Sequence, residues 1–196
     1  MTTSWQLKRI GTGRVTIPHE SKYERVERER RFLLRELPPG LKTSDPHAQV
    51  TDNYITNTRL RLRKKRWPAT NEWTLKLTQK YPPDPEDFSR TLITSIYLTE
   101  EEYEVLSVFE GNEIRKNRYR YEHEGRTFGI DMFLGSLFGL ILAETSFETD
   151  EEMAAFTQPP FAFMDVTNDP LFTGGNLVNL SFDDLRVEME KRLKED

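Results

Sequence analysis

The polar and apolar positions of this chain alternate strictly in several separate segments. Near its start, charged side chains occupy the alternate positions Glu27, Glu29 and Arg31. On a β-strand these three side chains lie on one face. A helix is the competing interpretation, because Glu24 with Arg28 and Glu27 with Arg31 form favourable pairs four residues apart. Taken alone, the segment favours a helix, so the choice depends on the rest of the chain.

Two-fold alternation predicts strands through most of the chain. Arg59, Arg61 and Arg63 alternate with leucines, and Lys76 lies on the polar side of another alternating segment. Turns and loops rich in Pro, Gly or Asn separate several of these segments. The predicted strands are 50–56, 59–63, 72–78, 90–98, 113–123, 126–133 and 137–147.

Capping signals predict about three helices between and after these strands. Thr99 and Glu102 have the spacing of a capping box, and Ser181 with Asp184 repeats that spacing before a final amphipathic segment. A short acidic helix is expected over 148–156, and Gly174-Gly175 is expected to be a loop. The polar strand faces fit either a sheet with one face in water or a closed barrel with a polar interior.

Composition narrows the class of protein. The chain has 196 residues, no cysteine and a net charge of −5, while six of the eight residues 59–66 are basic. One domain with a local anion site is therefore expected, rather than a nucleic-acid-binding surface. No apolar run reaches membrane-spanning length and no signal peptide is apparent, so we expect a cytoplasmic protein with no membrane partner.

The order of motifs resembles that of the CYTH family of triphosphate tunnel enzymes. The family opens with Glu-x-Glu-x-Lys before Phe-Leu, and here Glu27, Glu29 and Arg31 precede Phe32-Leu33. Six later blocks are similar and follow in the same order: Tyr54 with 58–63, then 75–76, 116–119, 130–133, 142–144 and 166–169. The resemblance covers about residues 23 to 180, which is most of the chain.

The resemblance implies an α+β fold, namely a closed barrel of eight mostly antiparallel strands with helices packed outside. It changes the interpretation of Glu27 to Arg31 from helix to strand. Residues 1–21 are then an N-terminal extension, and residues 22–196 are a single tunnel domain. The implied function is metal-dependent hydrolysis of inorganic triphosphate, thiamine triphosphate or a nucleoside triphosphate. A homodimer is also expected, because dimers are common among relatives.

The resemblance also assigns roles to charged residues. Lys116 and Glu29 are the expected catalytic residues. Mg²⁺ or Mn²⁺ is expected at Glu27, Glu29, Asp131 and Glu144. The expected phosphate-binding residues are Arg31, Arg59, Arg61, Arg63, Lys76, Arg90 and Arg118. Guanidinium groups suit this task because they bind phosphate oxygens in pairs.

Some family acids are missing, which leaves other functions open. Ser146 stands where relatives commonly have a second Glu, and Leu92 and Thr94 stand where they have a Glu-x-Glu pair. A second metal ion is therefore in question. The alternatives are an adenylate cyclase, a catalytically impaired binder of polyphosphate or phosphate, and a β domain whose charges only face water.

Overall fold

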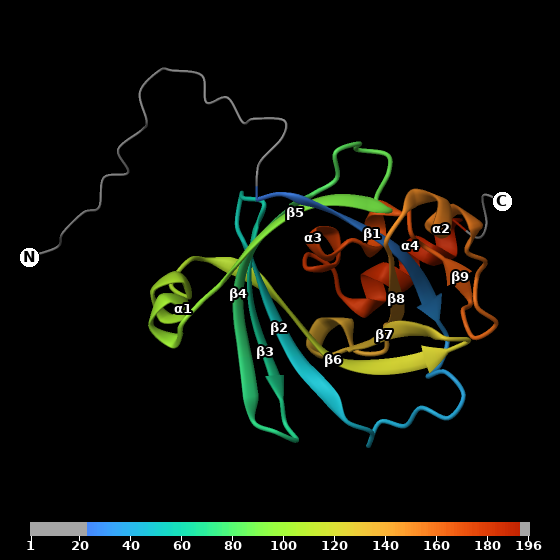
Figure 1. Ribbon diagram of the computed structural model, residues 1–196, viewed down its shortest axis with the longest axis horizontal. Coiled ribbons are helices and arrows are strands. Elements are labelled where there is room, and N and C mark those ends of the chain that lie inside the picture. Colours follow the sequence, from blue (N-terminus) through green and yellow to red (C-terminus); the bar gives the residue numbers. More distant parts are fainter. Residues whose placement is uncertain (1–22, 193–196) are drawn as a thin grey trace, which may run out of the picture.

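The alternating segments form the strands of one closed sheet. The computed structural model describes residues 23–192, so the predicted extension 1–21 lies outside the described residues. Figure 1 shows the strands curving around a common interior. They are β1 (Arg25–Leu34), β2 (His47–Ile55), β3 (Leu60–Trp67), β4 (Glu72–Tyr81), β5 (Arg90–Tyr97), β6 (Gly111–His123), β7 (Arg126–Phe133), β8 (Ile141–Phe147) and β9 (Met164–Asp165).

Eight of these strands close into an antiparallel barrel, which confirms the predicted fold. The order around the barrel is β5-β4-β3-β2-β6-β7-β8-β1, and β5 closes the ring by pairing with β1. All of these pairings are antiparallel. The two-residue strand β9 extends the sheet beside Phe32 and Leu33 of β1.

The first charged segment is a strand, although its local sequence favours a helix. β1 pairs with β8 along seven residue pairs and with β5 along four. Its outward residues Phe32 and Leu34 are buried in a cluster with Phe128 and Ile130 of β7. This burial outweighs helix propensity, and it turns the alternate residues of β1 toward the barrel interior.

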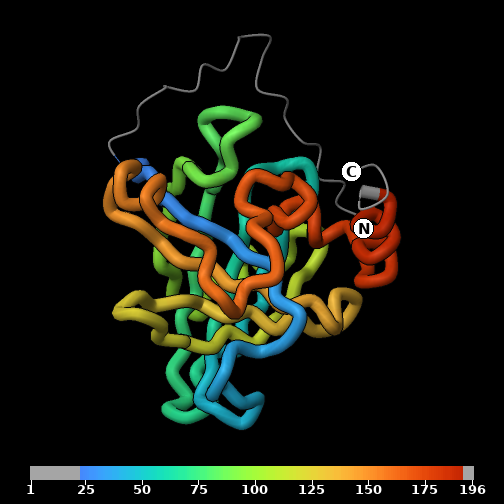
Figure 2. The backbone as a smooth tube through the Cα atoms, turned by 90° about the vertical axis from the view of Figure 1, so that its right-hand side faces the viewer, coloured from blue at the N-terminus to red at the C-terminus, as the bar shows by residue number. Residues whose placement is uncertain are grey.

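Among the described residues, four helices accompany the barrel, and the first and last of them begin at the predicted caps. They are α1 (Glu100–Leu106), α2 (Asp150–Ala155), α3 (Gly174–Leu177) and α4 (Phe182–Arg192), with the short 3₁₀ turns η1 (Gly135–Leu137) and η2 (Pro170–Phe172). The capping box of Thr99 with Glu102 is present at α1. In Figure 1, α1 lies apart from α2, α3 and α4. Figure 2 shows the C-terminal segment, in orange and red, running across one side of the barrel.

Two sequence predictions need correction. Gly174-Gly175 begins the short helix α3 instead of forming a loop. The predicted strand 137–147 begins only at Ile141, because η1 and a turn precede it. Both segments carry glycines that a pattern of apolar residues cannot assign to one conformation.

An apolar cluster packs the C-terminal segment against the strands. Leu33 of β1, Phe133 of β7 and Leu142 of β8 contact a group that includes Phe172 of η2 and Leu185 of α4. The polar positions of the strands therefore share the barrel interior with an apolar packing region. No helix within 23–192 combines the length and apolar character required to cross a lipid bilayer.

Candidate active site

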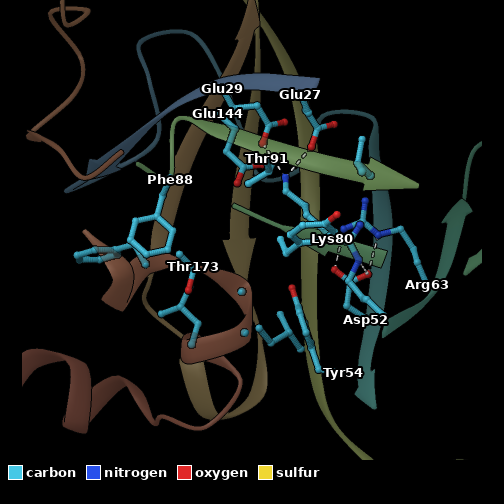
Figure 3. Close-up of a pocket in the computed structure, with 18 of the residues that line it drawn as sticks. Glu27, Glu29, Asp52, Tyr54, Arg63, Lys80, Phe88, Thr91, Glu144 and Thr173 are labelled. Atoms are coloured by element: carbon cyan, nitrogen blue, oxygen red, sulfur yellow. Dashed lines mark hydrogen bonds and ion pairs between the residues drawn. The ribbon is translucent and has the colours of Figure 1, made fainter. Parts of the chain in front are cut away.

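A highly charged cavity of about 500 Å³ lies within the barrel (Figure 3). Of the described residues, eight basic side chains and four carboxylates line it, which leaves an excess of four positive groups. Ten predicted site residues are among them. The charged lining consists of Arg31, Arg59, Arg61, Arg63, Lys76, Lys80, Lys116 and Arg118, with Glu27, Glu29, Asp52 and Glu144.

On one wall, a buried carboxylate positions two arginines. Asp52 of β2 accepts hydrogen bonds from Arg63 Nε and Nη2 at 2.6 and 2.7 Å, and Arg61 Nε lies 3.7 Å from the same carboxylate. Burial would raise the pKa of Asp52, but Arg61 and Arg63 hold it well below its ordinary value. Arg61 Nε is buried without a hydrogen-bond partner among the described atoms. An anion in the cavity could supply that partner.

Asp131 holds a second group of cations. Its oxygens lie 2.5 Å from Lys116 Nζ and 2.6 and 2.5 Å from Arg118 Nε and Nη2. Only 1% of its side chain is exposed, and it does not line the cavity. Asp131 therefore positions these two cations without lining the cavity, and its metal-binding role stays a prediction. The β6–β7 register sets Arg118 directly opposite it.

Glu144, which lines the cavity, is shared by two arginines. Its oxygens accept from Arg118 Nη2 at 2.5 Å and from Arg31 Nε at 3.0 Å. Burial would raise the pKa of Glu144, but Arg118 and Arg31 keep it well below its ordinary value. The carboxylate is therefore ionised at neutral pH and compensates part of the positive charge.

Glu27 and Glu29 point to the same cation from neighbouring inward positions of β1. Lys80 Nζ of β4 donates to Glu27 Oε2 at 2.6 Å and to Glu29 Oε2 at 3.1 Å (Figure 3). Burial would raise the pKa of Glu27, but Lys80 lowers it below the ordinary value. Sequence analysis missed Lys80, although alternation continues from Lys76 through Thr78 to it.

The positions of the predicted metal-binding carboxylates show whether they could hold a divalent ion. Among residues 23–192, no three His, Asp or Glu side chains are close enough to form a metal-binding group, so the predicted four-carboxylate set is not assembled. Glu27 and Glu29 nevertheless converge on one ammonium group. Mg²⁺ commonly takes only one or two carboxylates from a protein and the remaining oxygens from phosphate and water. This pair fits that chemistry.

Arg90 is a predicted phosphate-binding residue that lies outside the cavity. Its guanidinium Nε is 2.8 Å from Asp150 and its Nη1 is 2.5 Å from Asp87. The cavity-facing residues of β5 are Thr91 and Ile93. The alternating pattern does not establish which face of this strand is turned inward, and the phosphate-binding role of Arg90 stays a prediction. The inward face of β5 carries no acid.

Two lysines in the cavity have lowered pKa values. Burial, with Arg63 and Arg61 adding to it, lowers the pKa of Lys76 to about 8. Burial also lowers the pKa of Lys116, opposed by Asp131 and assisted by Arg118. Arg115, which precedes Lys116 in the sequence, forms an exposed pair with Glu113.

The C-terminal segment contributes part of the cavity lining. Thr173, Gly174 and Gly175 line it, and the hydroxyl of Tyr54 approaches Gly174 closely. A β-carbon at position 174 would lie 1.8 Å from this oxygen. Close packing against Tyr54 therefore requires glycine at position 174. The local sequence around this position does not reveal that constraint.

A second cavity, of about 460 Å³, shares a boundary with the first. Glu29, Arg118 and Glu144 line both. The second cavity is also lined by Arg126 and Ser146, the residue that replaces a family acid. The charged centre thus has open volume on both sides.

Comparisons with known proteins support a relation to triphosphatases. No family model matches the chain. An inorganic triphosphatase of Acetivibrio thermocellus is 39% identical over 95 residues, which cover 43% of this chain and 59% of that protein. The match therefore spans less than two thirds of this relative. An inorganic triphosphatase of Nitrosomonas europaea is 29% identical over 155 residues, covering 74% of this chain and 91% of that protein.

Solved structures agree with this relation. The inorganic triphosphatase NE1496 has a TM-score of 0.51 and 26% sequence identity, and the match covers 78% of this chain and 93% of that structure. Another structure, named the hypothetical protein NE1496, has a TM-score of 0.53 at the same identity, with 79% and 99% covered. The motif order, the closed barrel and these relatives together confirm that the chain resembles the CYTH family of triphosphate tunnel enzymes.

Proposed function

We propose that this chain is a divalent-metal-dependent triphosphatase, with inorganic triphosphate as its preferred substrate. The observation that carries the proposal is the charge of the cavity within the barrel: eight basic groups face four carboxylates among the described residues. A triphosphate with roughly four negative charges matches this excess, and guanidinium groups can bind its oxygens in pairs. The two curated relatives named inorganic triphosphatase favour the inorganic compound.

Phosphate binding falls to the basic residues of the walls. Arg61, Arg63 and Lys76 extend from β3 and β4, while Arg31 and Arg118 extend from β1 and β6. Arg59 stands at an exposed position with its guanidinium 4.2 Å from the ring centre of Tyr81. These groups orient the chain of phosphates and stabilise negative charge that develops during transfer.

Hydrolysis transfers the terminal phosphoryl group to water. A P–O bond forms to water, the bridging P–O bond breaks, and diphosphate, orthophosphate and a proton are released. Glu27 and Glu29 would hold Mg²⁺ or Mn²⁺, which supplies charge neutralisation and polarisation when bound. Glu29 and Lys116 are the residues we assign to orienting the attacking water and accepting or holding its proton, because both side chains line the cavity.

Phosphate release with Mg²⁺ or Mn²⁺ tests this proposal, using tripolyphosphate, thiamine triphosphate and ATP as substrates. The double substitution Glu27→Gln/Glu29→Gln should reduce release by more than about a hundredfold, because loss of even an outer-shell metal partner costs about tenfold to a hundredfold. Glu100→Gln/Glu104→Gln, on exposed α1, removes the same charge and should retain activity. Equal activity of both double variants would reject the assignment.

The same assays separate the alternative functions. Cyclic AMP formed from ATP would identify a cyclase, whereas tight triphosphate binding without metal-dependent release would identify a non-catalytic binder. The metal identity, the homodimer and the cytoplasmic location remain predictions from the sequence.

A further inference from the structure

Lys80 bridges the two carboxylates proposed to bind metal. Its ammonium contacts Oε2 of both Glu27 and Glu29, so one cation already joins these groups. Both pairs are substantially shielded, with 26% of the Lys80 side chain and 23% and 18% of the glutamate side chains exposed. An isolated exposed ion pair would have less influence on metal binding.

The contact of Lys80 joins two strands that are not neighbours in the sheet. Lys80 is on β4, the glutamates are on β1, and β5 separates these strands in the sheet. The cavity-facing residues of β5, Thr91 and Ile93, carry no charge. Lys80 therefore supplies positive charge to the carboxylates from beyond the intervening strand.

A divalent ion and this ammonium compete for the same oxygens. Metal bound between Glu27 and Glu29 would displace Nζ of Lys80, because the ammonium already occupies the Oε2 atom of each carboxylate and the two cations repel each other. The flexible four-carbon stem of lysine permits such a movement. Lys80 lines the cavity, where the oxygens of a bound triphosphate would offer the displaced ammonium a new partner.

We infer that Lys80 is an internal counter-ion that occupies the place of a divalent ion between Glu27 and Glu29, competes with metal, and transfers to phosphate when metal binds. This inference rests on the proposed metal-dependent function and adds a coupling between its ligands. Triphosphate should strengthen metal binding by giving Lys80 an alternative partner, and metal should strengthen triphosphate binding equally.

The decisive measurement is Mn²⁺ binding to the full chain without triphosphate, using electron paramagnetic resonance of free Mn²⁺ and isothermal titration calorimetry. Lys80→Met should lower the Mn²⁺ Kd by about tenfold or more, since even modest ion pairs summed over two carboxylates reach that range. Lys80→Arg should bind Mn²⁺ less tightly than Lys80→Met because it retains a competing cation. Adding tripolyphosphate should improve the Mn²⁺ Kd more in the wild type than in Lys80→Met.

Lys76→Met is the matched control. Lys76 lies on the same strand and lines the same cavity, but no hydrogen bond joins its described side chain to Glu27 or Glu29. Its substitution should improve Mn²⁺ affinity much less than Lys80→Met. Circular dichroism and thermal unfolding establish folding, and Lys80→Gln replaces Lys80→Met if the apolar variant is unfolded.

An unchanged or weaker Mn²⁺ affinity in a folded neutral variant at position 80 would overturn the inference. So would equal gains from Lys80→Arg and Lys80→Met. Phosphate release is a separate readout: tighter Mn²⁺ binding without any triphosphate hydrolysis would support the counter-ion role and reject the proposed enzyme activity.

Discussion

At the scale of single residues, buried acids position cations that face the cavity. Asp52 and Asp131 are 1% and 0% exposed, and their oxygens contact basic groups on neighbouring strands. A guanidinium or ammonium held in this way loses little freedom when phosphate binds. The acids therefore contribute through the geometry of the basic partners that they hold.

Asp52→Asn tests this role through stability. Removing one partner of a buried pair leaves the arginines poorly compensated, so the free energy of unfolding in urea should fall by about 3–5 kcal/mol. Glu113→Gln breaks an exposed pair with Arg115 and should change the free energy by less than about 1 kcal/mol. Equal losses would show that Asp52 does not serve as a buried counter-ion.

Lys76 predicts a pH dependence of triphosphate binding. Its pKa of about 8 means that the ammonium is present below pH 8 and is lost as the pH rises through that value. Above it, the Kd for tripolyphosphate should rise by up to about tenfold per pH unit if binding requires the charged form. Calorimetry from pH 7 to 9.5, with Lys76→Arg as the control, measures this effect. A parallel rise in both proteins would assign it to another group.

Alternation predicted many site residues because strand geometry sends every second side chain to one face. The family resemblance assigned Glu27 and Glu29, and alternation placed Arg61 and Arg63 on one strand face; all four line the cavity. Alternation does not show which way Arg90 points, because polar and apolar residues mix on both faces of β5. The sequence also does not show which acids Lys80 contacts, because Glu27 and Glu29 lie on a strand that is distant from it in sequence.

At the scale of elements, the short helix α3 is packed against strand β2 through Gly174 and Tyr54. Gly174→Ala should displace one of them, lowering the free energy of unfolding by about 1–3 kcal/mol and weakening tripolyphosphate binding. Gly175→Ala is the matched control because an added β-carbon there meets nothing within 4 Å. Urea unfolding and calorimetry compare the two. Similar losses would exclude close contact with Tyr54 as the cause.

The sequence predicts regular elements better than irregular ones. Capping residues identify α1 and the final helix α4, since Thr99 and Ser181 accept the expected backbone hydrogen bonds. Helix α3 and strand β9 are too short for a periodic signal, and tertiary contacts determine them. The helix-like local pattern of β1 gives way to pairing on both edges.

At the scale of the whole molecule, positive charge is concentrated inside a chain whose net charge is −5. A bound triphosphate should therefore relieve repulsion between several strands at once. At about 100 times its Kd it should add about 2.7 kcal/mol of stability, which raises the Tm by about 5–10 °C. Differential scanning calorimetry measures this shift.

Arg61→Gln/Arg63→Gln should lose most of the triphosphate-dependent Tm shift, whereas exposed Arg115→Gln should retain it. The Tm of each variant is compared with and without triphosphate, so that the effect of the substitution itself on stability cancels. A full shift in the double variant would place the bound anion away from this wall.

The barrel is closed where β5 meets β1, along only four residue pairs that are far apart in sequence. Forming this seam incurs a large loop-closure entropy before its contacts can stabilise the chain, so it is expected to form late in folding. Glu27 lies within the seam, and its lysine partner comes from the strand beyond β5. Folding intermediates with an open seam would therefore contain most of the hairpins while lacking the contact of Lys80 with Glu27 and Glu29, making the order of folding also the order in which binding competence is acquired.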